Sequence, residues 1–224
     1  MNRFMVKKLV QKDWYVIRYP VIGCAILAFV GLVLGLHGNG IAIVMSGVFL
    51  MISLILLMPA IVFTCIVIER KEQNLVFIMS LPVSNVEYTA AKVVLSLGLY
   101  FLFWLFVYAG TVSVLYIRLD ISNSILPYLT LLFGEILMFY CLLFATAIVS
   151  QAESWTTAVM IFGNIVMSCT PGLAPANAGI RASLEASAPL WNGTILGVIS
   201  FEVLVIIITI SVMLYMQLKK KDFL

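Results

Sequence analysis

The chain has 224 residues, of which 63% are hydrophobic and only 10% are charged, and its mean hydropathy is +1.15. Because a soluble domain seldom exceeds about 50% apolar residues, this composition excludes an ordinary soluble protein and predicts several membrane-spanning helices. The net charge of +3 comes from basic residues that form no soluble patch and no aromatic-interleaved stripe, so nucleic-acid binding is not indicated. We therefore expect an all-α membrane protein with one transmembrane domain over residues 1–224.

Residues 1–18 predict an amphipathic helix that lies in the membrane interface. Apolar and basic side chains take different sides of a helical wheel, Trp14 and Tyr15 lie near the boundary, and Asp13 interrupts the apolar side. Basic residues facing headgroups and aromatic residues at the boundary are typical of interfacial helices. A soluble amphipathic first helix is the alternative.

Six apolar segments that could each cross a bilayer follow in the chain. They cover approximately residues 19–36, 41–68, 85–117, 126–149, 155–167 and 194–218. The second is longer than a bilayer needs, and Pro59 is expected to kink it. The third starts with capping-box spacing at Ser84–Glu87. Residues 168–193 are expected to form a long outer loop, with a short surface or re-entrant helix near 178–186.

The distribution of Lys and Arg predicts the orientation. With both termini on one side, eleven of the thirteen basic residues fall on that side, and only Arg118 and Arg181 fall on the other. Because basic residues are enriched in cytoplasmic loops, the termini and residues 69–84 are expected to be cytoplasmic, in a multi-pass protein of the plasma membrane.

The cytoplasmic loop 69–84 combines charged flanks with an apolar middle. Residues 75–79 read LVFIM, mixed charges precede them, and Leu81-Pro82 ends the turn, since the residue before proline disfavours helical geometry. A short apolar helix between two spans is suited to docking in a groove of a partner protein. An interfacial helix with no partner is the alternative.

The stretch ERKEQNLVFIMSLPVSNVEYTAAK, residues 69–92, resembles the cytoplasmic loop of type-2 ABC exporter permeases. The matching positions are Glu69, Ser80, Leu81, Pro82, Val83, Ser84, Glu87 and Lys92. The layout of the whole chain is also similar to that family, with an interfacial first helix, six spans and a long outer loop before the last span. Its small size resembles the permease subunits of phenol-soluble-modulin peptide exporters.

The resemblance implies a permease that pairs with a second copy, as a homodimer or heterodimer, and inserts a coupling helix into each of two ABC ATPase subunits. The expected coupling residues are Glu69, Arg70, Lys71, Glu72, Leu75, Phe77, Ile78, Met79, Leu81 and Pro82. The chain contains no phosphate-binding loop of the GxxxxGK[ST] type, so ATP and Mg²⁺ are expected in the partner ATPase and no cofactor in this chain. We expect no enzyme activity from the permease itself.

Glu135 and Glu202 lie inside predicted spans, where an ionisable group is costly and is usually functional. Counted from the outer ends of their spans, both lie at roughly 12–14 Å depth, and equal depth would allow them to share one polar spot. They could contact a cargo or take part in gating. Alternatively, they are hydrogen-bonded carboxyls that hold helices together, with Tyr140 or Tyr108 as candidate partners.

Three other classes of function are compatible with the sequence to different degrees. An enzyme within the membrane would need converging catalytic groups, and the chain offers one histidine and two isolated intramembrane carboxylates. An ion channel would usually show a selectivity loop or a ring of charge. A non-transporting accessory or immunity protein that binds a partner is the alternative that the sequence excludes least.

Overall fold

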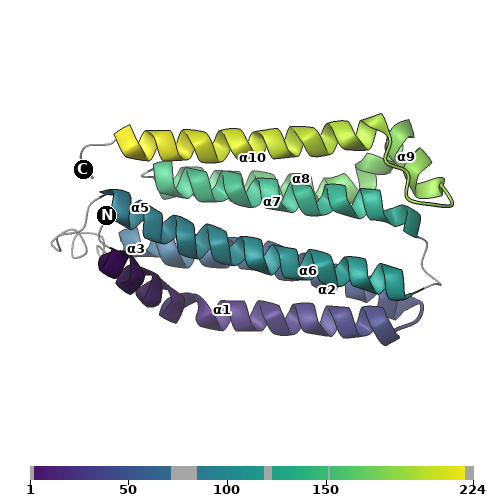
Figure 1. The fold of residues 1–224 in the computed structure, drawn as a ribbon, viewed down its shortest axis with the longest axis horizontal. Helices are drawn as coiled ribbons and strands as arrows, with labels where there is room; N and C mark the ends of the chain where they lie inside the picture. The colour runs from purple at the N-terminus through teal and green to yellow at the C-terminus, as the bar shows by residue number, and fades with distance from the viewer. Residues whose placement is uncertain (1–2, 72–84, 119–122, 151, 220–224) are drawn as a thin grey trace.

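The computed structural model describes residues 3–71, 85–118, 123–150 and 152–219, and it consists of helices in these ranges, without β-strands. Six of the helical stretches are long and apolar enough to cross a membrane. They run side by side as an elongated bundle (Figure 1). The prediction of an all-α membrane protein with six spans is thus confirmed.

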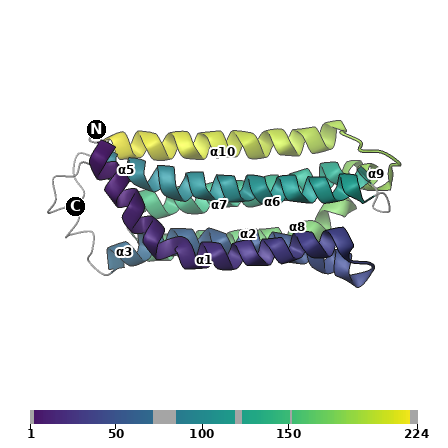
Figure 2. The ribbon, with the colours of Figure 1, turned by 60° about the horizontal axis from the view of Figure 1, so that its bottom comes forward.

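The first helix, α1 (Arg3–His37), contains both the predicted interfacial segment and the first span. The helix predicted over residues 1–18 is present from Arg3 and is continuous with the first span. Pro20 lies inside α1, and the part before it is inclined to the rest (Figure 2). A proline removes one backbone hydrogen bond, which bends a helix without always ending it. Asp13 and Ile17 are buried, so the amphipathic part packs on the protein.

The second and third spans each change their winding close to the segment that joins them. The second consists of α2 (Ile41–Val62) and the π-helical segment η1 (Phe63–Val67), and α3 (Ile68–Lys71) continues the helix beyond it. The third consists of α5 (Asn85–Lys92), the π-helical segment η2 (Val93–Leu97) and α6 (Gly98–Ile117). The predicted start after Ser84 agrees with α5. Pro59 lies within α2, and the helix continues past it into η1.

The remaining spans follow the sequence pattern with one difference. The elements are η3 (Asn123–Ile125), α7 (Leu126–Val149), α8 (Glu153–Leu173), η4 (Ala174–Ala176), α9 (Ala178–Glu185) and α10 (Gly193–Lys219). Helix α8 extends six residues beyond the predicted end at 167, because Pro171 falls in its last turn and does not end it. Helix α9 is the predicted short helix, and the side chain of Asn177 accepts a hydrogen bond from Gly179 N at its start.

Helix α7 is the most buried span and packs against α2, α6, α8, α9 and α10. Tyr140 of α7 stacks on Tyr100 of α6 with ring centroids 3.7 Å apart, and its hydroxyl donates to the Ser96 carbonyl over 2.6 Å. Large apolar side chains of α1, α6, α8 and α10 are exposed, as expected for helices that face lipid.

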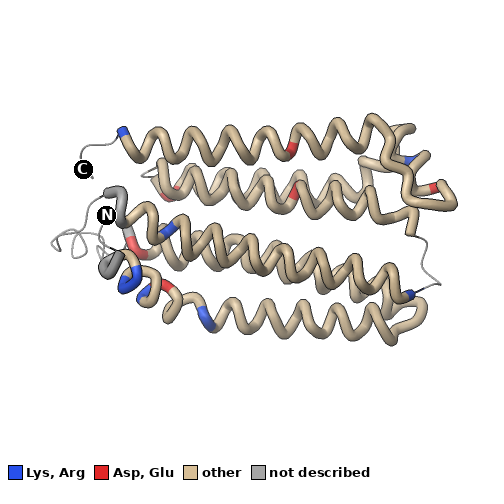
Figure 3. Tube along the Cα trace, in the orientation of Figure 1, with Lys and Arg blue, Asp and Glu red and all other residues tan. Residues whose placement is uncertain are grey.

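Charged residues gather at the end of the bundle where α1 and α5 begin and α3 and α10 end, which we call the charged end (Figure 3). At the opposite end, Arg118 after α6 donates to the carbonyls of Gly38 and Leu36 over 2.8 and 3.1 Å. This arginine satisfies carbonyls at the C-terminus of α1, which have no partner within the helix.

Candidate functional sites

Three helices meet at a buried group of charged side chains at the charged end. The ammonium of Lys92, in α5, lies 2.6 Å from Asp13 Oδ2 of α1 and 2.5 Å from Glu69 Oε2 of α3. All three side chains are at most 6% exposed. The same ammonium donates to the carbonyl of Cys65 over 2.7 Å. Lys92 therefore has an acceptor for each of its three protons.

Two further side chains complete this group. Lys12, whose side chain is 44% exposed, donates to Glu69 Oε1 and lies 3.6 Å from Asp13. The hydroxyl of Tyr88 donates to Glu69 Oε2 over 3.1 Å. We call Lys12, Asp13, Glu69, Tyr88 and Lys92 the charge cluster. It contains two carboxylates and two ammonium groups, so its formal charges cancel, as buried ionic groups require.

The π-helical segments help to bring the charge cluster together. Cys65 belongs to η1, and Lys92 is the residue directly before η2. A π-helical turn contains an extra residue, which changes the direction of the side chains that follow, and such turns are frequent at functional sites. The contacts of Lys92 thus join the helix before segment 72–84 to the helix after it, close to the two π-helical segments.

The surroundings of Glu69 favour its ionised form. Burial acts to raise the pKa of this carboxyl, but the ammonium of Lys92 and the hydrogen bonds from Lys12 and Lys92 outweigh burial and hold the pKa below its ordinary value. Glu69 therefore carries a negative charge throughout the neutral range.

The structure describes only part of the predicted coupling surface. Glu69 lies in the charge cluster, and Arg70 and Lys71 are the last two residues of α3. The structure describes the backbone of these two residues but not their side chains. The other predicted coupling residues lie outside the described residues: Glu72, Leu75, Phe77, Ile78, Met79, Leu81 and Pro82. The resemblance singled out Glu69 and Lys92 but not their contact. It also missed Asp13, for which a carboxylate on the apolar side of residues 1–18 was the available signal.

Glu135 and Glu202, which we call the carboxyl pair, lie on the adjacent helices α7 and α10, both buried. Figure 3 shows one acidic segment about midway along each of these helices. The carboxylate of Glu202 rests against Gly134, where any Cβ atom would collide with it. Because Gly134 directly precedes Glu135, the prediction that the two carboxyls lie at one depth agrees with the structure.

The two carboxyls differ in their hydrogen bonds. Glu135 Oε1 accepts a bond of 2.7 Å from the hydroxyl of Thr170 in α8, a hydroxyl that is also 3.0 Å from the Val166 carbonyl. Glu202 Oε2 is buried and has no hydrogen-bond partner. The predicted partners are wrong, since Tyr140 donates to Ser96 and Tyr108 bonds to Thr130.

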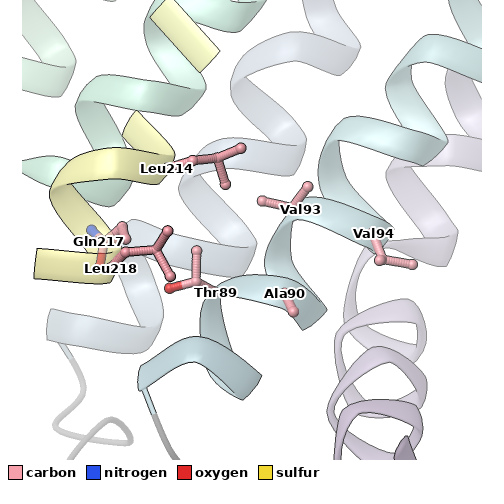
Figure 4. A pocket seen from close by; sticks show the side chains of 7 residues that line it. All are labelled: Thr89, Ala90, Val93, Val94, Leu214, Gln217 and Leu218. Carbon is pink, nitrogen blue, oxygen red and sulfur yellow. The ribbon is translucent and has the colours of Figure 1, made fainter. Parts of the chain in front are cut away.

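An apolar pocket of about 280 Å³ lies beside the charged end, between α10 and the α5–η2 stretch (Figure 4). Thr89 and Val93 line one side, and Leu214 and Leu218 line the other. Gln217 also lines it, but its amide donates to the Ile148 carbonyl over 3.0 Å. The pocket therefore offers few polar groups to a ligand.

Within the described ranges, no three His, Cys, Asp or Glu side chains are placed to hold a metal ion. The chain was compared with protein-family models, with curated proteins and with solved structures, and none of them matches it.

Proposed function

We propose that this chain is the membrane-spanning permease subunit of an ATP-driven ABC exporter. It acts with a second permease copy and is coupled to two copies of a separate ATPase subunit. The cargo is amphipathic or hydrophobic, such as a peptide, toxin or drug. The distribution of basic residues favours a plasma-membrane protein with both termini in the cytoplasm.

The charge cluster is the observation that carries this proposal. Glu69 and Lys92 lie on the helices before and after segment 72–84, and they are paired with each other. Asp13 links the same ammonium to α1. A push or pull on the segment would therefore act on three helices together, which is what coupling to an external motor requires.

The sequence of the segment supports a protein partner. Its apolar residues 75–79 follow the charged run Glu69–Glu72, a combination suited to an apolar contact bordered by salt bridges. The exposed apolar faces of α1, α6, α8 and α10 leave room for lipid and for a second permease copy.

The test is copurification of this chain with a candidate ABC ATPase subunit. We expect the double variant Phe77→Asp and Met79→Asp to insert normally but to lose both the complex and the stimulated ATP turnover. Leu173→Asp is the control, because it places an aspartate on an exposed apolar residue at the opposite end of the bundle. That variant should retain the complex.

Two results would change the proposal. Retention of the complex by the double variant would remove residues 77 and 79 from the interface. Binding of the ATPase without any stimulation of ATP turnover or transport would instead indicate the accessory protein that binds a partner and does not export.

A further inference from the structure

Among the residues that the structure describes, no positive charge is paired with Glu135 or Glu202. Lys12 and Lys92 of the charge cluster pair with Asp13 and Glu69 instead. Helices α7 and α8 contain no Lys or Arg, and the only basic residue of α10 is Lys219 at its end. Two adjacent buried carboxylates without a cation would be strongly unfavourable if both were ionised.

Among the described ionisable groups on the surrounding helices, the cations are engaged elsewhere and the other groups cannot carry a positive charge. Tyr128 donates to the Pro171 carbonyl, Arg181 of α9 is exposed and donates to the Pro175 carbonyl, and Lys92 is held in the charge cluster. The elements that pack around α7, α8 and α10 also contain tyrosine, cysteine and glutamate side chains, none of which can carry a positive charge. They are Tyr88, Tyr100, Tyr108, Tyr116, Tyr140, Cys65, Cys141, Cys169, Glu153, Glu185 and Tyr215.

Geometry distinguishes the two carboxyls. Glu135 receives the Thr170 hydroxyl, and a hydrogen bond to a carboxylate favours its ionised form. Glu202 Oε2 has no donor, although the Glu202 side chain is 96% buried, and it faces the bare backbone of Gly134. A negative charge on Glu202 Oε2 would therefore lack compensation from a cation or a hydrogen bond.

We propose that Glu135 and Glu202 form a proton-binding site between α7 and α10, in which Glu202 holds the proton and Glu135 is its coupled partner. The site stands apart from the proposed export function, because it depends only on the contacts of α7, α8 and α10.

The test uses dicyclohexylcarbodiimide, an apolar reagent that adds to protonated carboxyl groups. The carboxyl proton goes to a nitrogen of the reagent and the carboxyl oxygen bonds to its central carbon, and the adduct rearranges to a stable N-acylurea that mass spectrometry locates. The full chain in lipid nanodiscs is labelled at pH 6.5 to 9. At pH 7.5 we expect Glu202 to be labelled at least about tenfold faster than the exposed carboxyl of Glu185.

Two variants test the coupling between the carboxyls. Glu135→Gln removes the neighbouring charge, so labelling of Glu202 should fall severalfold at the pH where the unaltered protein is half labelled. Gly134→Ala should displace the Glu202 carboxyl from α7, since the new Cβ collides with the far end of that flexible side chain. Labelling of Glu202 should then no longer respond to Glu135→Gln. Gly197→Ala in α10, where a Cβ meets nothing, is the matched control.

Three outcomes would overturn the proposal. They are labelling of Glu202 no faster than that of Glu185, labelling of Glu135 in place of Glu202, and a labelling profile of Glu202 that is identical in the unaltered protein and in Glu135→Gln. The first two are read on the unaltered protein, so they do not depend on the folding of any variant.

Discussion

The charge cluster and the carboxyl pair each contain two buried carboxyl groups, but their surroundings differ. In the charge cluster, Asp13 and Glu69 share the ammonium of Lys92, and Lys12 adds a second positive charge. In the carboxyl pair, Glu135 has one hydroxyl partner and Glu202 Oε2 has none. Burial alone therefore does not decide the state of a carboxyl in this bundle. The cations and hydrogen-bond donors within reach decide whether the carboxyl is ionised. Removing these partners one at a time tests the difference between the charge cluster and the carboxyl pair.

The largest effect is expected from Lys92→Met, which leaves Asp13 and Glu69 buried without their shared cation. Breaking a buried ionic group in this way costs about 3–5 kcal/mol. The free energy of unfolding in mixed detergent micelles measures it. Lys7→Met, which removes an exposed lysine of the same helical segment as Lys12, is the control and should change stability by less than about 0.5 kcal/mol. A loss below about 1 kcal/mol for Lys92→Met would contradict the pairing described here.

A smaller effect is expected from Glu69→Gln, at about 1.5–3 kcal/mol for the loss of hydrogen bonds to a charged group. Because the pKa of Glu69 is lower in the folded protein than in the unfolded chain, its contribution is complete above about pH 4.3 and is lost as the pH falls through the folded value. Thermal unfolding followed from pH 7 to pH 3 should show a weaker acid dependence in Glu69→Gln. Glu185→Gln, at an exposed carboxyl, should leave that dependence unchanged.

Removing only the Tyr88 hydroxyl should have a still smaller effect. Tyr88→Phe deletes the 3.1 Å bond to Glu69 Oε2, while the two lysines keep that carboxylate paired. We expect a loss of about 1 kcal/mol in unfolding free energy. Tyr215→Phe, at an exposed ring of α10, is the matched control. An effect as large as that of Lys92→Met would mean that the hydroxyl, and not the ammonium, dominates the cluster.

The smallest effect is expected from Glu202→Gln. If Glu202 already holds a proton, the amide replaces a neutral group of similar shape, and stability should change by less than about 0.5 kcal/mol. A loss of several kcal/mol, comparable with Lys92→Met, would show that the ionised carboxylate is needed in the fold. The same unfolding assay therefore measures both halves of the comparison.

Local sequence patterns predicted most of the fold. The six apolar segments, the start of α5 at Asn85 and the short helix α9 all appear in the structure. The patterns were less exact at helix ends, since α1 continues through Pro20 from the amphipathic segment into the first span and α8 continues past residue 167 to include Pro171. Whether a proline bends or ends a helix depends on the neighbouring packing, which the local sequence does not encode.

The candidate sites were predictable to different degrees. A constant rise per residue was enough to place Glu135 and Glu202 at one depth, because both are counted from the same side of the membrane. The contact of Lys92 with Asp13 joins residues 79 positions apart, through a change of winding on either side of segment 72–84. The periodicity of a single helix cannot predict a contact between two helices. The position of Asp13 on the apolar side of residues 1–18 was the one local indication that this carboxylate has a buried partner.

The contact between Asp13 and Lys92 also has a consequence for biogenesis. Since the cluster joins α1, α3 and α5, Asp13 and Glu69 emerge from the ribosome well before the Lys92 ammonium does. Until the third span is inserted, these carboxylates have to stay hydrated or protonated at the edge of the bilayer. Closure of the cluster therefore reports that three successive spans have inserted in the correct order and register.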